Sequence, residues 1–235
     1  MIKLQGLTKS YYTPAGEFTA LRDIDLEVGA GEFVAIAGKS GSGKSTLLNL
    51  IGGIDRPSSG TVEVGDTEIH RLSENRLAVW RGRNVGFVFQ FFQLLPTLTV
   101  AENVMLPMDF CRTYPAGQRR KRASDLLERV GVAVQADKLP SALSGGEQQR
   151  AAIARALANG PRVILADEPT GNLDSATGTA VLDIFRAMAG SGTTVVIATH
   201  DRDIMRAADR KVELADGALL VSAANPASAK HEAGR

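Results

Sequence analysis

The segment from Gly38 to Thr46 constrains the fold of this chain more than any other, because it reads GKSGSGKST and matches the pattern G-x-x-x-x-G-K-[ST]. It lies between an apolar, strand-like run, Glu32 to Ala37, and a helix-like run, Leu47 to Ile54. Glycines let the backbone of such a loop wrap around a phosphate, whose charge then meets exposed N–H groups where the helix begins. Lys44 is placed to bridge terminal phosphates, and Ser45 to ligate Mg²⁺. The pattern predicts a strand, a phosphate-binding loop and a helix, in that order.

The bulk composition excludes several other classes of protein. The chain has 235 residues and a formal net charge of +1, which fits neither a strongly basic nucleic-acid binder nor an acidic tail protein, so no nucleic acid partner is expected. Its single cysteine, Cys111, allows no disulfide within the chain. The N-terminus lacks the apolar core of a signal peptide, and no apolar run approaches the roughly 18 residues of a membrane span. We therefore expect a cytoplasmic location, with any membrane span supplied by a separate polypeptide.

Short β-branched or apolar runs alternate with helical patterns along the chain, which is typical of an α/β protein with a mostly parallel, buried sheet. These runs are Glu32 to Ala37, Val85 to Phe89, Val163 to Ala166 and Thr193 to Ala198. Two stretches that alternate between apolar and polar residues, Ala20 to Val28 and Gly60 to Ile69, predict a small antiparallel β layer beside this sheet.

A helical subdomain is expected inside the α/β core. Between Thr97 and Leu157 no strand is predicted, and the helix-like stretches are broken by Pro96, Pro107, Pro115 and Pro140. We place this subdomain at about residues 96–158, within one domain that covers residues 1–222. The small, polar residues 223–235 are expected to form a loose tail.

A pair of carboxylates follows the strand-like run that ends at Ala166. Asp167 and Glu168 would lie at the carboxyl end of that strand, where a phosphate loop needs a second Mg²⁺ anchor. Asp167 is expected to hold the metal directly or through water, and Glu168 to orient or deprotonate an attacking water molecule. An Asp-Glu pair alone is more typical of a solvated strand end or a helix N-cap, but the phosphate loop upstream favours the metal and the base.

A second anion-binding segment occurs about 100 positions after the phosphate loop, where Leu143 to Arg150 read LSGGEQQR. Ser144 to Gly146 open a helix-like stretch, so small residues and free N–H groups face outward at its positive end. A serine N-cap followed by a Gly-Gly turn is the simpler interpretation of this segment in isolation.

Together, these motifs closely resemble the ATP-binding subunits of ABC transporters, and the similarity runs from about Met1 to about Leu220. The motifs also follow the family's order: the phosphate loop, Gln90 closing the strand VGFVFQ, the LSGGE signature, the Asp167-Glu168 pair, Gly171 to Asp174, and His200 after TVVIAT. The resemblance implies a P-loop NTPase fold with a RecA-like core, and ATP and Mg²⁺ as cofactors. It also implies a homodimer in which each signature caps the ATP bound by the other subunit.

The resemblance assigns further roles to individual residues. Gln90 contacts Mg²⁺ and the attacking water, and His200 contacts the γ-phosphate. Tyr11 stacks on adenine, a role that the neighbouring Tyr12 could also fill, and Asp174 lies across the dimer interface. The expected catalytic residues are Glu168, His200, Gln90 and Lys44, and the expected metal ligands are Ser45, Gln90 and Asp167. The expected nucleotide-binding residues are Tyr11, Gly38, Ser40, Gly41, Ser42, Gly43, Lys44, Ser45, Thr46, Ser144, Gly145, Gly146 and Asp174.

Two segments are similar to the lipoprotein-releasing and macrolide-exporter group: EPTGNLDSATG from Glu168 to Gly178, and FFQLLP from Phe91 to Pro96. This similarity implies that ATP-driven dimer closure powers a separate membrane permease for export or extraction, from the inner face of the cell membrane. A regulatory cell-division ATPase and an importer of polar amino acids remain alternatives. Ribosome- or DNA-associated members are disfavoured, because the chain has one phosphate loop, one cysteine and no heptad run. Since Glu168 is present, active hydrolysis is expected.

A basic run, Arg119 to Arg122, is the remaining candidate binding site. Such a run can contact lipid headgroups or nucleic acid. Asp125 and Glu128, however, lie within ion-pairing reach along the same predicted helix. We interpret the run as a solvated helix face.

Overall fold

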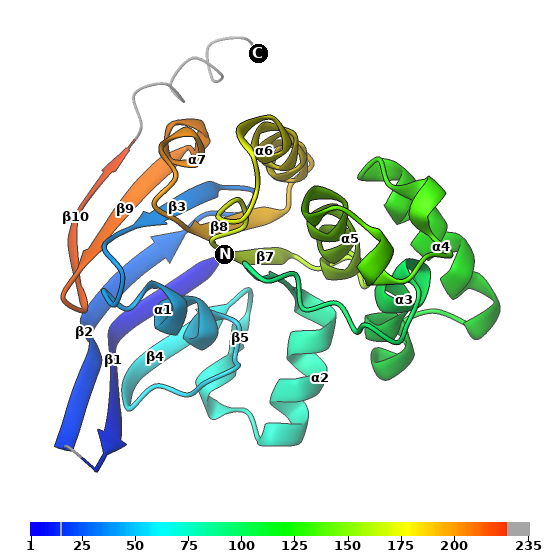
Figure 1. Cartoon of the computed structure of the whole chain (residues 1–235). Helices are drawn as coiled ribbons and strands as arrows, with labels where there is room; N and C mark the ends of the chain where they lie inside the picture. The colour runs from blue at the N-terminus through cyan, green and yellow to red at the C-terminus, as the bar shows by residue number, and fades with distance from the viewer. Residues whose placement is uncertain (15, 225–235) are drawn as a thin grey trace, which may run out of the picture.

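The computed structural model describes residues 1–14 and 16–224 and arranges their strands in two sheets (Figure 1). The larger sheet has six strands in the order β10-β9-β3-β8-β7-β6. All its neighbouring strands run parallel except β10, which pairs antiparallel with β9. The strands of this sheet are β3 Phe33–Ala37, β6 Val85–Val88, β7 Val163–Asp167, β8 Thr194–Ala198, β9 Arg210–Ala215 and β10 Ala218–Ala224. The smaller, antiparallel sheet contains β1 Ile2–Thr13, β2 Gly16–Val28, β4 Ser59–Val64 and β5 Thr67–Glu68.

The helices lie on both sides of the larger sheet. Their bounds are α1 Lys44–Ile51, α2 Glu74–Asn84, α3 Val100–Cys111, α4 Ala116–Arg129, α5 Gly145–Ala156, α6 Ser175–Gly190 and α7 Arg202–Ala207. Short 3-10 turns cover Ile69–Arg71, Ala133–Gln135 and Pro140–Ala142. None of the helices in the described part of the chain has the length and hydropathy needed to cross a bilayer.

The parallel sheet is buried on both faces, which explains why its strands read as continuous apolar runs. Along β3, Phe33 and Ala35 pack into a core shared with α3 to α7, whereas Val34 and Ile36 pack into a second core on the opposite face. This second core lies between the two sheets and contains the buried face of α1. The alternation follows from the two-residue period of a strand. The predicted α/β class with an antiparallel layer is thus confirmed.

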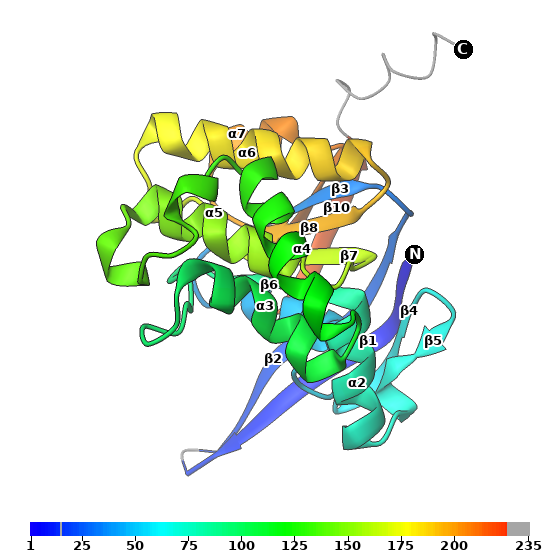
Figure 2. The same cartoon turned by 90° about the vertical axis from the view of Figure 1, so that its right-hand side faces the viewer.

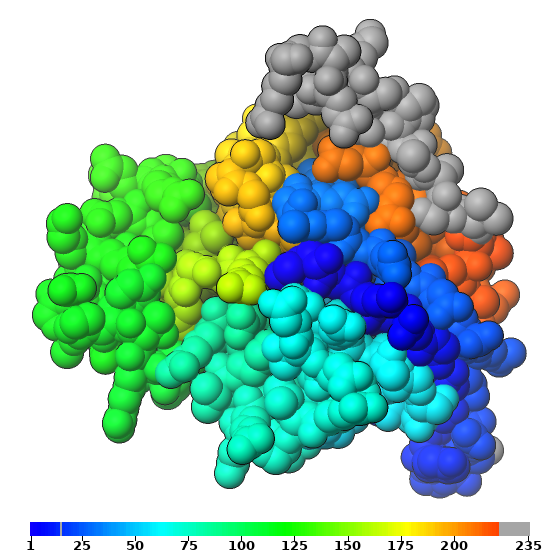
Figure 3. Space-filling model, turned by 180° about the vertical axis from the view of Figure 1, so that it is seen from behind, coloured from blue at the N-terminus to red at the C-terminus, as the bar shows by residue number. Residues whose placement is uncertain are grey.

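Residues 96–158 contain helices and no strand, as expected, and form a lobe at one side of the sheet (Figures 2 and 3). Both α3 and α5 begin with a capping box, from Thr99 to Glu102 and from Ser144 to Glu147. One expectation for this region is wrong, because Pro107 lies inside α3 instead of breaking it. Asn159 Nδ2 donates a hydrogen bond to the carbonyl oxygen of Pro107, which contributes to holding this part of the helix in place.

The basic run on α4 is a solvated face only in part, because Arg120 and Lys121 are exposed whereas Arg119 and Arg122 are half-buried. Arg119 and Arg120 pair with Asp109 and Asp137 on neighbouring segments, not with acidic residues of their own helix. The side chain of Arg119 is only 16% exposed. Packing of α4 beside α3 brings Arg119 close to Asp109, a contact that spacing along one helix does not indicate. Ion pairs at the surface contribute at most about 1 kcal/mol each.

The expected polar tail also begins later than predicted. Ala223 and Ala224 belong to β10 and pair with Lys211 and Arg210 of β9. Small residues carry little strand propensity, but the neighbouring strand supplies the backbone partners that determine their conformation. The rest of the expected tail lies outside the described residues.

Core packing around α6 provides a test of this architecture. Phe185 is fully buried between α6 and the large sheet. We expect Phe185→Ala to lower the free energy of unfolding by about 3–5 kcal/mol, because the substitution leaves a cavity. Phe110→Ala removes the same side chain from a position that is 80% exposed, and should change stability by less than about 0.5 kcal/mol. Chemical denaturation of both variants measures the difference, and equal losses would contradict the core described here.

Candidate functional site

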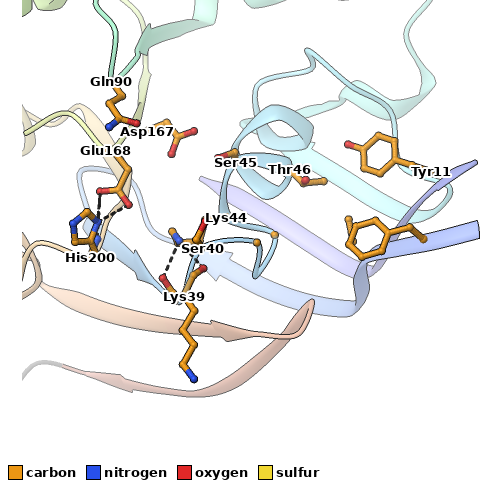
Figure 4. A pocket seen from close by; sticks show the side chains of 15 residues that line it. Tyr11, Lys39, Ser40, Lys44, Ser45, Thr46, Gln90, Asp167, Glu168 and His200 are labelled. Carbon is orange, nitrogen blue, oxygen red and sulfur yellow. Dashed lines mark hydrogen bonds and ion pairs between the residues drawn. The ribbon is translucent and has the colours of Figure 1, made fainter. Parts of the chain in front are cut away.

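A pocket of about 620 Å³ lies at the edge of the large sheet where β3, β6, β7 and β8 end (Figure 4). Because these strands are parallel, their carboxyl ends converge at one edge, where ligands of open α/β sheets bind. The residues that line the pocket are Tyr11, Phe18, Ala20, Gly38, Lys39, Ser40, Gly41, Gly43, Lys44, Ser45, Thr46, Gln90, Asp167, Glu168 and His200. Most of the residues predicted from motifs far apart in the sequence therefore meet in one cavity.

The phosphate loop connects β3 to α1 in a tightly folded conformation. Lys44 is 8% exposed, and its Nζ donates hydrogen bonds to the carbonyl oxygens of Gly38, at 2.8 Å, and Lys39, at 3.0 Å. Gly43 has a φ of 104°, and a Cβ at this position would lie 2.7 Å from the carbonyl oxygen of Ala20. Only glycine fits there without moving the backbone. The Lys44 ammonium group is thus buried beside the N-terminus of α1, and both hydrogen bonds that it donates go to neutral carbonyl groups. This arrangement is suited to binding an anion.

Asp167 at the end of β7 faces the first turn of α1. Its carboxylate is hydrogen-bonded to Ser45. Burial raises the pKa of Asp167 and the charge of Glu168 raises it further, although the hydrogen bond with Ser45 and the charge of Lys44 act in the opposite direction. A bound cation would relieve the repulsion between the two neighbouring carboxylates.

Glu168 is the next residue, and it adopts a left-handed conformation with a φ of 46°. Its side chain is 16% exposed and interacts with the end of β8. Thr199 Oγ1 donates to Glu168 Oε2 at 3.2 Å, and His200 Nδ1 lies 3.0 Å from Glu168 Oε1 (Figure 4). Because a non-glycine residue in this conformation is uncommon, the backbone geometry is consistent with a site that requires the carboxylate at this position.

Gln90 follows β6 and lines the pocket on the same side as Asp167 and Glu168 (Figure 4). The segment after Glu168 packs against it: Asn172 Nδ2 donates to the carbonyl oxygen of Gln90 at 3.0 Å. A Cβ added to Gly171 would lie 3.2 Å from the side-chain nitrogen of Gln90. Gln90 and the segment 171–172, although far apart in sequence, are therefore in direct contact.

Five residues predicted to bind nucleotide do not line the pocket of their own chain. Ser42 is buried, and its hydroxyl has no hydrogen-bond partner in the described structure. Ser144 and Asp174 are N-caps that accept hydrogen bonds from Glu147 and Thr177, respectively. The other two are Gly145 and Gly146 of the signature. The signature and Asp174 are therefore separated from the phosphate loop that the same chain carries.

The structure also brings residues to the pocket that the sequence analysis missed. Phe18 lies opposite Tyr11 in the β1–β2 pairing, and both aromatic residues line the pocket. The Tyr11 hydroxyl donates to Asp55 at 2.8 Å. The antiparallel register of the hairpin was the available signal for Phe18, whereas nothing in the local sequence indicated Asp55.

A glycine-rich loop between a buried strand and a helix, with two carboxylates at the end of a parallel strand, defines a P-loop nucleotide-binding domain. Residues 21–171 match the family described as ABC transporter, and the chain belongs to that family. The ATP-binding domains of this family hydrolyse ATP. The family resemblance drawn from the motifs is thereby confirmed.

Several named proteins share most of this sequence. The chain is 49% identical over 220 residues to the macrolide export ATP-binding/permease protein MacB 1/2 of Paracoccus denitrificans, covering 94% of this chain and 33% of that protein. It is 46% identical over 220 residues to the ABC transporter ATP-binding protein YknY of Bacillus subtilis, covering 94% of this chain and 95% of that protein. The chain thus spans about a third of the length of its macrolide export relative.

Solved structures show the same fold. The dimeric, post-hydrolysis structure of the ATP-binding cassette MJ0796, bound to ADP and Pi, is 42% identical with a TM-score of 0.89, covering 95% of this chain and 98% of that one. The structure of cbiO1 from Clostridium perfringens, part of the ABC transporter complex cbiONQ, is 32% identical with a TM-score of 0.84, covering 98% and 90% of the two chains. These similarities confirm the predicted P-loop NTPase fold.

Proposed function

We propose that this chain is the ATP-binding and ATP-hydrolysing subunit of a membrane export or extraction system. One observation carries the proposal: the phosphate loop, two carboxylates, Gln90 and His200 line one pocket, while the signature lies outside it. A site with phosphate ligands and a candidate base is complete for hydrolysis chemistry only when a second copy supplies the signature. The named relatives that combine an ATP-binding part with a permease for macrolide export support the direction of transport.

The phosphate loop binds the phosphates of ATP in this proposal. Lys44 and the loop amides, from Gly38 to Thr46, surround the β- and γ-phosphates. The nearby donor set fits Mg²⁺, because Ser45, Gln90 and Asp167 offer oxygen ligands, and Ser45 and Asp167 already interact. When bound, the cation neutralises charge that develops on the phosphate oxygens.

Glu168 orients and deprotonates the water that attacks the γ-phosphate. Its carboxylate faces the pocket and accepts a hydrogen bond from Thr199, which limits its rotation. His200 holds Glu168 in place through the 3.0 Å contact with Oε1 and contacts the γ-phosphate from the pocket wall, and Gln90 helps to position the water. The Tyr11 ring stacks on adenine.

Two copies of the chain close around two ATP molecules. The signature residues Ser144, Gly145 and Gly146 of one copy cap the ATP that the other copy binds, and Asp174 lies across the interface. The N–H groups at the start of α5 and the positive end of its dipole suit contact with an anion. The solved structures of MJ0796 are dimeric, which supports the pairing of two copies.

Closure of this dimer drives a separate transmembrane permease, which places the chain on the inner face of the cell membrane. The test is affinity purification of the Glu168→Gln chain with Mg-ATP from detergent-solubilised native membranes, followed by mass spectrometry. We expect a permease with a large extracytoplasmic domain. Recovery of a multi-span uptake permease, or of cell-division proteins, would support one of the alternatives. Recovery of only soluble ribosomal or DNA-associated proteins would contradict the transporter proposal.

A further inference from the structure

We propose that Lys9 and Asp55 are positioning residues that hold the Tyr11 ring as a preformed platform for the nucleotide base. This inference rests on the proposed function, since it concerns the base end of the ATP site. It assigns a role to two charged side chains that do not line the pocket and are not among the residues that the sequence motifs indicate.

One carboxylate connects the three side chains. Asp55 accepts a hydrogen bond from the Tyr11 hydroxyl through Oδ2, at 2.8 Å, and one from Lys9 Nζ through Oδ1, at 2.7 Å. The ammonium group of Lys9 also lies 4.7 Å from the centre of the Tyr11 ring, in cation–π geometry. The hydroxyl and the ring of Tyr11 are therefore both engaged, which restricts rotation of the side chain.

Partial burial supports a preformed arrangement. The Lys9 side chain is 12% exposed, and that of Asp55 is 29% exposed. Although burial opposes ionisation, hydrogen bonds from Lys9 and Tyr11 lower the pKa of Asp55. Burial and the hydrogen bond to Asp55 raise the pKa of Tyr11, although a hydrogen bond with Thr46 acts in the opposite direction. The cluster thus keeps Asp55 charged and Tyr11 protonated at neutral pH, the states in which their hydrogen bond is strongest.

The backbone connects this cluster to the phosphate loop. Asp55 follows α1, and the amides of Ile54 and Asp55 both donate to the carbonyl oxygen of Asn49 in that helix. The first residue of the same helix is Lys44. A rigid helix therefore separates the lysine that faces the phosphates from the carboxylate that holds Tyr11. This spacing sets the distance between the phosphate and base subsites before any ligand binds.

Strand geometry selects Tyr11 over Tyr12 for this role. Lys9 and Tyr11 are two residues apart on β1 and share one face of the strand, whereas Tyr12 points to the other face and is 83% exposed. Tyr11 lines the pocket with Phe18, its partner in the register of the hairpin. These positions favour Tyr11 over Tyr12 as the platform for the base.

The test separates base binding from phosphate binding. Tyr11→Phe removes only the hydroxyl, and Asp55→Asn removes the charge that links Tyr11 to Lys9. Tyr12→Phe is the matched control, because it removes the same atom from the exposed neighbour. Dissociation constants of the variants, each otherwise identical to the whole chain, are measured by calorimetry for Mg-ATP and for inorganic tripolyphosphate, which has no base.

We expect Tyr11→Phe and Asp55→Asn to weaken Mg-ATP binding about three- to tenfold, because the ring at position 11 is then no longer held in place and the ligand must order it on binding. Binding of tripolyphosphate, and both affinities of Tyr12→Phe, should stay at the wild-type values. Wild-type ATP affinity in both test variants would overturn the inference. So would an equal loss of tripolyphosphate affinity, because it would indicate a general disturbance of the site. A wild-type chain that binds neither ligand would contradict the proposed function itself.

Discussion

Replacing Lys44 with alanine should weaken Mg-ATP binding by about 30- to 5,000-fold and abolish hydrolysis at ordinary ATP concentrations. This fold-change corresponds to about 2–5 kcal/mol of binding free energy, which is the usual cost of truncating one partner of a buried, hydrogen-bonded charge pair. Lys44 is almost fully buried, and its two hydrogen-bond partners are neutral carbonyl groups, so its charge remains available for phosphate. Equilibrium binding of a fluorescent ATP analogue measures the affinity, and phosphate release measures turnover.

The control for this prediction is Lys121→Ala, which removes an exposed lysine from α4, in the helical subdomain. This variant should bind and hydrolyse ATP as the wild type does. A Lys44→Ala protein with full ATPase activity would refute the assignment of the phosphate site. A similar loss in both variants would point to a nonspecific effect of charge.

The second large effect is expected for Glu168→Gln, which should lower the rate of ATP hydrolysis about 10²- to 10⁴-fold, the contribution of a positioned general base. The amide keeps the shape of the side chain and can still accept the hydrogen bond from Thr199 Oγ1, but it cannot take a proton from water. ATP affinity should therefore remain close to that of the wild type. Steady-state phosphate release and equilibrium binding measure the two quantities separately.

Because hydrolysis is blocked, the same variant should accumulate as a homodimer with Mg-ATP, observed by size-exclusion chromatography with light scattering. Glu213→Gln changes an exposed carboxylate on β9 and should behave as the wild type does. A Glu168→Gln chain that hydrolyses ATP at the wild-type rate would exclude Glu168 as the base. A chain that binds ATP but remains monomeric would contradict the role of the signature.

Local sequence predicted the central part of the fold well. The four predicted buried strands correspond to β3, β6, β7 and β8 with shifts of one residue, because both faces of a parallel sheet require continuous apolar runs. The phosphate loop and the Asp167-Glu168 pair are also local patterns whose surroundings follow from chain order. The sequence was less informative at Pro107, where contacts with Asn159 and the rest of the subdomain outweigh the helix-breaking tendency of proline.

The same distinction between local patterns and tertiary contacts holds for the predicted site. Residues within one motif, such as Lys44 and Ser45, were assigned from their spacing, and the structure places both in the pocket. The sequence did not indicate Phe18 or Asp55 as neighbours of Tyr11. Phe18 lies opposite Tyr11 because the two strands of a hairpin pair, and Asp55 contacts Tyr11 from a segment 44 positions further along the chain. No periodicity within a single segment encodes such a contact.

Local sequence was enough to predict the groups that the proposed chemistry needs: its motifs indicate a phosphate loop, a candidate metal-binding carboxylate and a candidate base, because backbone geometry and residue type act over a few positions. Which of these groups share a cavity follows from the three-dimensional packing of the chain. This packing separated Ser144 and Asp174 from the pocket, paired Arg119 with Asp109, and joined Lys9 and Asp55 to Tyr11. Helix packing and strand pairing bring distant segments together, and the order of neighbouring residues alone determines neither the packing nor the pairing.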